Sequence, residues 1–249
     1  MGKIISVHSY RGGTGKSNMT ANLATTLAMM GYKVGVVDTD IQSPGIHIIF
    51  QLEEDKITKT LNDYLREKCP VEETAYDITP SEVQGKGSIH LIPSSMKANA
   101  ISLILRDGYD VGLLSDGIRE LIRHYEFDYF LIDTHPGLNE ETLLSITISD
   151  RLVLILRPDH QDFQGTAVTA EVARKLGIPK MVMVVNKALP ALDRDKLREK
   201  VENSYGAPVA GILPLSEEMV HLGSSGVFCL KYPDHFITAE IKKIVQELL

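Results

Sequence analysis

The sequence predicts an α/β fold in which a doubly wound, mostly parallel sheet carries helices on both faces. Short β-branched runs alternate along the chain with segments of helical spacing, which is the order of parallel βαβ units. Most of these runs are continuously apolar, as expected for strands that are covered on both sides. The 249 residues contain no linker, repeat or low-complexity stretch, so we expect a single domain over residues 1–249.

The elements follow from these patterns in chain order. Strands are expected at 3–9, 33–40, 88–94, 127–134, 151–157, 180–187 and 208–214. Helices are expected at 17–30, 111–125, 162–176 and 193–204. Three of these helices precede a glycine (Gly31, Gly177 and Gly206), the residue that best tolerates the positive φ of a helix C-terminus. Residues 41–87 are the least regular and are expected to form surface loops and short helices against the sheet edge.

The composition is that of a globular protein, with 43% hydrophobic and 24% charged residues. No apolar run approaches the roughly 20 residues that span a bilayer, and no secretory signal is visible, so a cytoplasmic location is expected. The net charge of −7 argues against a surface that is basic all round and leaves room for a local basic patch. Cys69 and Cys229 form no CxxC pair or Cys/His cluster, which disfavours a disulfide framework and a zinc or iron-sulfur site.

A glycine-rich loop, YRGGTGKS at 10–17, joins the first expected strand to the first expected helix. In this setting glycines let backbone N–H groups turn toward phosphates, and the helix N-terminus adds a favourable dipole. The strict pattern GxxxxGK[ST] fails because its first glycine falls on Tyr10, yet the strand-loop-helix context still predicts a phosphate site. Lys16 is expected to reach the β and γ phosphates, and the Ser17 hydroxyl to ligate magnesium. The expected nucleotide-binding residues of this loop are Gly12, Gly13, Thr14, Gly15, Lys16, Ser17 and Asn18.

Two further strands end in aspartates. Asp133 closes the apolar run of FDYFLIDTHPG, where a carboxylate can hold the water shell of magnesium. Asp38 and Asp40 close the run of VGVVDTDIQSPG, at the edge where doubly wound sheets bind ligands. Carboxylates repel a neighbouring triphosphate. We therefore expect either a metal ion between them or a carboxylate that positions or activates the attacking water.

These motifs resemble the ParA/MinD family of ATPases. RGGTGKS, VVDTDIQSPG and FLIDTHPG are similar, in this order, to its deviant Walker A, A′ and Walker B motifs, and the resemblance covers residues 1–249. It implies a P-loop NTPase of the deviant Walker A class that uses ATP and Mg²⁺ and hydrolyses ATP slowly until a partner stimulates it. By this resemblance Asp40 positions the hydrolytic water, and Ser17, Asp38 and Asp133 serve the magnesium. Segments VVNK and GILPLSEEM resemble the family's adenine segments, which implies roles for Asn186, Lys187 and Pro214.

Arg11 stands where the family has a lysine that crosses a dimer interface and contacts the ATP of the partner subunit. Arginine keeps the positive charge and adds a planar head with several donors. We therefore hypothesise that Arg11 acts in trans within an ATP-dependent homodimer. Some relatives that position carboxysomes, the McdA branch, lack the lysine and use another basic residue, for which Arg151 is the alternative candidate here.

Two segments bear on the surface that such a switch would hold. An apolar stripe in the ending HFITAEIKKIVQELL (Ile237, Ile241, Ile244, Val245 and Leu248) lies opposite mixed charges, which favours a helix packed on the core over a membrane helix. Segment 187–200 interleaves five basic residues with three acids. It is either half of a patch for non-specific DNA that dimerisation completes, or a solvated helix face. The basic residues are Lys187, Arg194, Lys196, Arg198 and Lys200.

The resemblance implies a dimerising ATPase switch that positions or partitions a carboxysome, plasmid or chromosome, through an adaptor or stimulating protein and non-specific binding to nucleoid DNA. The alternatives are a membrane-associated MinD-like regulator of cell division and a P-loop metabolic synthetase or kinase, for which His135 is the only nearby base. A bacterial tyrosine kinase is disfavoured because Tyr232 is the only tyrosine in the last forty residues. An iron-sulfur carrier and a scaffold without turnover complete the alternatives.

Overall fold

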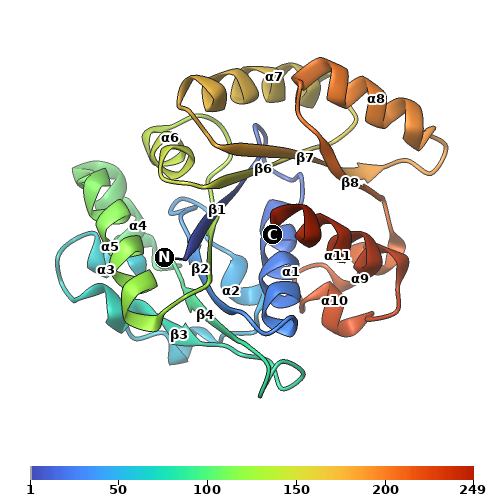
Figure 1. Ribbon diagram of the computed structural model, residues 1–249. Helices are drawn as coiled ribbons and strands as arrows, with labels where there is room; N and C mark the ends of the chain where they lie inside the picture. The colour runs from blue at the N-terminus through green and yellow to red at the C-terminus, as the bar shows by residue number, and fades with distance from the viewer. Residues whose placement is uncertain (1) are drawn as a thin grey trace.

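The computed structural model describes residues 2–249, and an eight-stranded sheet forms its centre (Figure 1). The strand order is β3-β4-β2-β5-β1-β6-β7-β8, and all neighbours are parallel except β3, which pairs antiparallel with β4 at the edge. The strands are β1 (Lys3–His8), β2 (Lys33–Asp38), β3 (Tyr76–Asp77), β4 (Ser88–Ile92), β5 (Tyr129–Asp133), β6 (Arg151–Leu156), β7 (Lys180–Ala188) and β8 (Val209–Pro214).

Helices cover both faces of this sheet, which confirms the predicted fold class. They are α1 (Lys16–Met29), α2 (Ile46–Ile49), α3 (Leu61–Tyr64), α4 (Ala98–Asp107), α5 (Val111–Tyr125), α6 (Glu140–Thr147), α7 (His160–Lys175), α8 (Arg194–Tyr205), α9 (Glu217–Leu222), α10 (Phe228–Lys231) and α11 (Phe236–Leu248). One face carries α1, α10 and α11, and the other carries α5 over β2, β4 and β5 and α7 and α8 over β6, β7 and β8.

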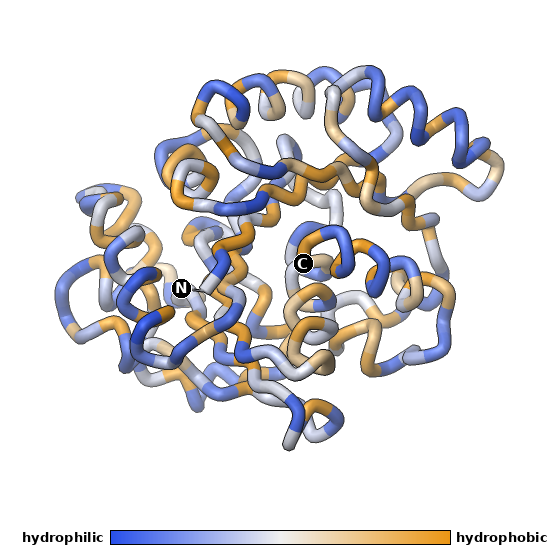
Figure 2. The backbone as a smooth tube through the Cα atoms, in the orientation of Figure 1, coloured by the Kyte–Doolittle hydropathy of each residue, from blue (hydrophilic) through white to orange (hydrophobic). Residues whose placement is uncertain are grey.

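All seven predicted strands and all four predicted helices are present, with bounds that differ from prediction by at most two residues. The central strands are mostly apolar and lie between the helical layers, as Figure 2 shows. The three glycines expected at helix ends have positive φ: 100° at Gly31, 78° at Gly177 and 57° at Gly206. Continuous apolar runs and glycine punctuation were therefore sufficient signals for these elements.

Residues 41–87 form short helices, two 3-10 turns and the edge strand β3, which pairs with β4, so this region lies at the sheet edge as predicted. The sequence did not reveal β3, because two residues are too few to show a periodicity. It also left α4 and α6 unassigned. In α4 only Ile104 is buried, and α6 has only eight residues. Neither helix therefore has a long buried apolar stripe that would identify it in the sequence.

The final helix α11 packs against α1 and β8. Every residue of its predicted apolar stripe is fully buried, which confirms a helix packed on the core. Within residues 2–249 no helix combines the length and the apolar character needed to cross a membrane.

Candidate functional site

The carboxyl ends of β1, β2 and β5 bring the predicted motifs together at one edge of the sheet. In the register of these parallel strands Asp133 lies opposite Val7 on one side and opposite Asp38 on the other. The glycine-rich loop follows β1 directly and leads into α1. Three segments that are distant in sequence therefore meet in space, as the fold class requires.

The loop presents its backbone to a cavity of about 260 Å³. Gly13 and Gly15 have φ values of 76° and 92°, a conformation that side chains rarely adopt. Gly15 is the N-cap of α1, and no side chain in the described part of the chain caps that helix. The first N–H groups of α1 are thus available to an anion, which is the arrangement that binds phosphate. All seven predicted loop residues, Gly12 to Asn18, line this cavity.

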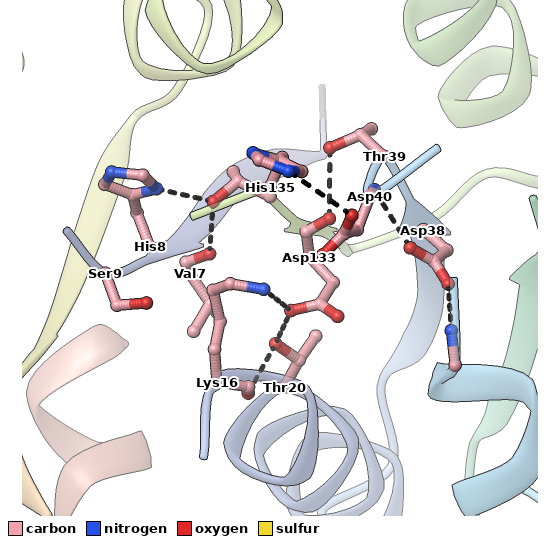
Figure 3. A network of polar contacts seen from close by, with 12 residues as sticks. Val7, His8, Ser9, Lys16, Thr20, Asp38, Thr39, Asp40, Asp133 and His135 are labelled. Atoms are coloured by element: carbon pink, nitrogen blue, oxygen red, sulfur yellow. Dashed lines mark hydrogen bonds and ion pairs between the residues drawn. The ribbon is translucent and has the colours of Figure 1, made fainter. Parts of the chain in front are cut away.

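Lys16 reaches under the loop to the end of β5. Its Nζ lies 3.4 Å from Oδ1 of Asp133, and the side chain is only 8% exposed (Figure 3). Thr20, one turn further along α1, donates a hydrogen bond of 3.0 Å to the same oxygen. This contact joins α1 to β5 and places the Lys16 ammonium beside a group of carboxylates.

Asp38 and Asp133 are both buried, with 1% and 0% exposure. Asp38 accepts hydrogen bonds from the backbone N–H groups of Asp40 (3.0 Å) and Gly45 (3.1 Å). Burial, and next the neighbouring charge of Asp133, raise the pKa of Asp38 to about 7. Oδ2 of Asp133 is buried and finds no hydrogen-bond partner among residues 2–249.

This donor set fits magnesium. Mg²⁺ prefers oxygen ligands, and a buried carboxylate oxygen without a partner beside a second buried carboxylate is what a cation would satisfy. The hydroxyl of Ser17, which lines the cavity, supplies a third oxygen at the predicted position. When bound, the ion supplies positive charge at the terminal phosphates.

Asp40 points toward the same space and lines the phosphate cavity. Its Oδ1 accepts a hydrogen bond from the N–H of Ser43 (3.1 Å) and lies 3.8 Å from Nε2 of His135 (Figure 3). Burial raises the pKa of Asp40, while Lys16 and His135 oppose that shift. Asp40 therefore stands as a base candidate at the wall of the loop cavity, with a histidine facing it.

The three residues predicted to contact adenine do not lie together. The side-chain amide of Asn186 donates 2.7 Å to the carbonyl of Thr14, and Nζ of Lys187 donates 2.8 Å to the carbonyl of Gly13. Both side chains hold the phosphate loop from the side of β7. Pro214 ends β8 opposite Ala188, and none of the three residues is part of the cavity lining.

Arg11 lies at the rim of the cavity and turns toward the start of α7. Its Nη1 is 3.4 Å from Asp162 and 3.7 Å from Asp159. Arg157 bonds the same two carboxylates, at 3.0 Å to Asp162 and 3.3 Å to Asp159. Arg11 thus shares its acidic partners with a second arginine, and its side chain remains 36% exposed.

Arg151 lies elsewhere. It is the first residue of β6, opposite Ile5, whereas the phosphate loop follows the last residue of β1. Its Nη2 donates 3.0 Å to the carbonyl of Leu249. Because β1 and β6 are parallel, Arg151 lies toward the opposite edge of the sheet from the phosphate loop.

The structure adds residues that the motifs did not indicate. A Cβ at Gly165 of α7 would lie 1.8 Å from the ring of Tyr10, so that glycine makes room for the residue that replaces the first glycine of the loop. A glycine within a predicted helix was the available signal. His8, fully buried, hydrogen-bonds through Nδ1 to Thr134 (2.7 Å), and burial lowers its pKa to about 3.

The basic segment 187–200 is engaged within the chain at four positions. Lys187 bonds the phosphate loop, Lys196 pairs with Asp193, Arg198 pairs with Glu202, and Lys200 lies over the ring of Phe163. These contacts are exposed and can open at little cost. The segment is basic enough for a phosphate-binding patch. In this structure, however, four of its five basic side chains already contact other residues of the chain.

Comparisons with known proteins identify relatives of this arrangement. A family model described as "ParA: NUBPL iron-transfer P-loop NTPase" matches residues 1–249. The chain is 31% identical over 187 residues to an uncharacterized ATP-binding protein of Methanocaldococcus jannaschii, a match covering 74% of this chain and 64% of that protein. It is 29% identical over 186 residues to the cytosolic Fe-S cluster assembly factor CFD1 of Candida glabrata, covering 72% and 59%. The chain thus spans less than two thirds of both relatives.

Among solved structures, the septum site-determining protein MinD of Pyrococcus horikoshii, complexed with Mg-ADP, superposes with a TM-score of 0.83. The match covers 100% of this chain and 96% of that one at 22% identity. At this identity the likeness establishes the fold.

Proposed function

The chain belongs to the ParA/NUBPL family of P-loop NTPases, and on this premise we propose that it is an ATP-dependent dimerising ATPase of ParA/MinD type that positions or partitions an intracellular cargo. In this proposal residues 1–249 act as one ATPase domain, ATP and Mg²⁺ are its cofactors, and a partner protein stimulates a slow hydrolysis. The family membership supports the nucleotide chemistry. The dimer, the partner and the cargo are the parts that experiments must test.

The observation that carries the proposal is the buried cluster under the phosphate loop. Lys16 sits between the loop and Asp133, with Asp38 beside it and Asp40 at the cavity wall. Phosphoryl chemistry needs positive charge at the transferred group and an oriented water, and this cluster offers a residue for each task. The relative solved with Mg-ADP supports the same cofactors here.

In the proposed reaction the N–H groups of Gly13 to Ser17 and the Lys16 ammonium hold the phosphates, and Ser17, Asp38 and Asp133 would hold Mg²⁺. Asp40 accepts a hydrogen bond from the attacking water and orients it toward the γ-phosphate. Arg11 leaves Asp159 and Asp162 and reaches the phosphates of the partner subunit. Its guanidinium then neutralises developing charge in the manner of an arginine finger.

The test is the oligomeric state of the Asp40→Ala variant, measured by size-exclusion chromatography with light scattering, with ADP and with ATP plus magnesium. The variant removes the water-positioning carboxylate and should therefore retain ATP. We expect a monomer with ADP and a dimer with ATP. Asp55→Ala, which removes an exposed aspartate far from the loop in sequence, is the matched control and should behave as the wild type.

If the variant binds ATP and stays monomeric with both nucleotides, the proposed ATP-dependent dimer is wrong. The metabolic synthetase or kinase would then become the leading function.

For the cargo surface we propose nucleoid DNA, with a carboxysome, plasmid or chromosome as the positioned body. A gel-shift assay of the ATP-bound dimer on non-specific DNA in low salt tests this. Charge reversal at Arg194 and Lys196 should weaken the shift together, because each contacts phosphate rather than bases. The buried apolar stripe of α11 favours DNA over a membrane as this surface, because that stripe is packed on the core.

A second candidate is iron-sulfur cluster transfer, which the name of the family model and of the CFD1 relative favour. Cys229 is buried on α10, and Cys69 is partly exposed in the irregular region after α3. Residues 2–249 contain no group of three or more His, Cys, Asp or Glu side chains that could hold a metal. Reconstitution with iron and sulfide, followed by absorption spectroscopy of wild type and Cys69→Ala, decides: cluster absorption that the variant loses would establish this function.

A further inference from the structure

The two residues that hold the phosphate loop, Asn186 and Lys187, are neighbours in strand β7. Successive side chains of a regular strand point to opposite faces of the sheet, so two neighbours do not ordinarily reach one loop. Here both do. Asn186 donates to the carbonyl of Thr14 at 2.7 Å, and Lys187 donates to the carbonyl of Gly13 at 2.8 Å. The strand therefore departs from regular geometry at this point.

A bulge in β7 accounts for this departure. Val185 pairs with Ile212 and Ala188 pairs with Pro214, so two residues of β7 stand opposite one residue of β8. Lys187 has a φ of 57°, a left-handed conformation that glycine adopts readily and lysine seldom. Bulges are frequent next to active sites, where they re-aim a side chain. The bend itself would suit a glycine, so the side chain of Lys187 is the feature that this position adds.

The two hydrogen bonds fix the direction of two N–H groups in the loop. In a trans peptide the C=O of one residue and the N–H of the next point in opposite directions. Because Lys187 holds the carbonyl of Gly13, the N–H of Thr14 is turned away from that side chain. Asn186 does the same for the N–H of Gly15 by holding the carbonyl of Thr14. The loop residues line the phosphate cavity and these two side chains do not, so the side chains can act only through the loop.

The amide group of Asn186 is engaged on both sides. The residue is only 4% exposed, and while its nitrogen donates to Thr14, its oxygen accepts the N–H of Lys187 at 2.9 Å. A Cβ on Gly15 would lie 2.5 Å from that amide nitrogen, so the loop and the amide are in close contact. An asparagine held in this way is oriented toward the loop rather than toward the edge of a base.

We propose that Asn186 and Lys187 are positioning residues that set the affinity of the loop for a polyphosphate chain, whatever base the chain carries. They turn the N–H groups of Thr14 and Gly15 toward the phosphates and contact no part of the nucleotide themselves. This role takes the place of the adenine contact that the family resemblance implies for both residues. It rests on the proposed function, in which this loop binds a nucleoside triphosphate.

Calorimetric titration with magnesium and ATP, GTP or inorganic tripolyphosphate separates this role from recognition of the base. Asn186→Ala and Lys187→Met should each weaken the binding of all three ligands by the same factor, about tenfold, because one hydrogen bond to the loop is lost. Lys175→Met removes another exposed ammonium, one that pairs with Glu171 on α7, and this matched control should bind as the wild type. Lys187→Arg keeps a donor and should bind all three ligands more tightly than Lys187→Met.

A loss of affinity for ATP without a matching loss for tripolyphosphate would show that the residue contacts the nucleoside, which would overturn the proposal. Unchanged binding of tripolyphosphate in both Asn186→Ala and Lys187→Met would overturn it as well.

Amide NMR spectra of the ligand-free protein give a readout that needs no nucleotide. Lys187→Met should move the resonance of Thr14, and Asn186→Ala that of Gly15, by more than either variant moves that of Asn18. Resonances of Thr14 and Gly15 that stay in place would contradict the positioning role. If the wild type binds none of the three ligands, the proposed function fails, and the same resonances still decide whether the two side chains hold the loop.

Discussion

At the scale of single residues, the unusual feature is the concentration of carboxylates around one lysine. Asp38 and Asp133 are neighbours in the strand register, and both are buried. Burial, and next the like charge of Asp133, raise the pKa of Asp38 to about 7. The ionisation of Asp38 in the metal-free site should therefore change near neutral pH.

Asp38 should make the metal-free protein less stable as pH rises. Its folded pKa of about 7 exceeds the unfolded value of about 3.8, so the folded state binds the extra proton between these values. The contribution of Asp38 is fully present below about pH 4 and is lost as pH rises through 7, by up to about 4 kcal/mol. Urea unfolding in EDTA should show this slope in the wild type relative to Asp38→Asn.

His8 works in the opposite direction, because its folded pKa of about 3 lies below the unfolded value of 6.5. Its stabilising contribution is present above pH 6.5 and is lost as pH falls toward 3. Since His8 is common to both proteins, the difference between wild type and Asp38→Asn isolates the aspartate. Parallel pH curves for the two would contradict the assignment.

A second prediction at this scale concerns Arg11. Its ion pairs with Asp159 and Asp162 compete with any contact across a dimer, and Arg157 can serve both acids after Arg11 leaves. Asp159→Asn keeps the helix cap of α7 and removes one charge. We expect two- to fivefold tighter ATP-dependent dimerisation, the range of an exposed ion pair.

Analytical ultracentrifugation in the Asp40→Ala background measures that change. The same substitution in Arg11→Ala should have no effect, since the competing group is gone. A gain of equal size in both backgrounds would show that Asp159 acts without Arg11.

At the scale of elements, helix α7 is shaped to fit the phosphate loop. Gly165 leaves the space that the ring of Tyr10 occupies. Gly165→Ala should destabilise the protein by about 1–3 kcal/mol through overpacking. In a Tyr10→Ala background the same change should instead be neutral or stabilising by up to about 1 kcal/mol, because alanine is the better helix former.

Chemical denaturation of the four proteins completes this double-mutant cycle. Additive effects of the two changes would mean that the ring and the helix do not depend on each other.

The elements that the sequence predicted share one property. Each has an apolar pattern long enough to be recognised as a strand or a helix. The run before Asp133 and the stripe from Ile237 to Leu248 are examples, and both are buried as predicted. The phosphate loop was recognisable despite Tyr10 because its strand and helix flanked it. The contacts of Arg11 were not predictable, since Asp159 and Asp162 follow a different strand and carry no motif.

At the scale of the whole molecule, the site depends on strand order, which local sequence does not encode. Asn186 lies 172 positions from Thr14 and yet holds its carbonyl. The resemblance supplied Asn186 and Lys187 as nucleotide residues. Only the fold shows that their side chains brace the loop, because β7 must first be placed beside β6, which in turn pairs with β1.

Helix α11 completes the hydrophobic core, so a substitution that disrupts its packing should destabilise the whole domain. Ile241 is fully buried in α11, which packs on α1 and β8. Ile241→Ala should cost about 2–5 kcal/mol in urea unfolding. Lys243→Ala on the exposed face of the same helix should stay within about 0.5 kcal/mol. Equal small losses would place α11 outside the cooperative core.

The packing of α11 on α1 also orders events during synthesis. The helix that follows the phosphate loop leaves the ribosome roughly two hundred residues before the helix that covers it. Until then the part of α1 that packs on α11 stays uncovered, and the nascent chain exposes that apolar surface over most of its translation. The fold around the phosphate loop should therefore be completed only late in synthesis.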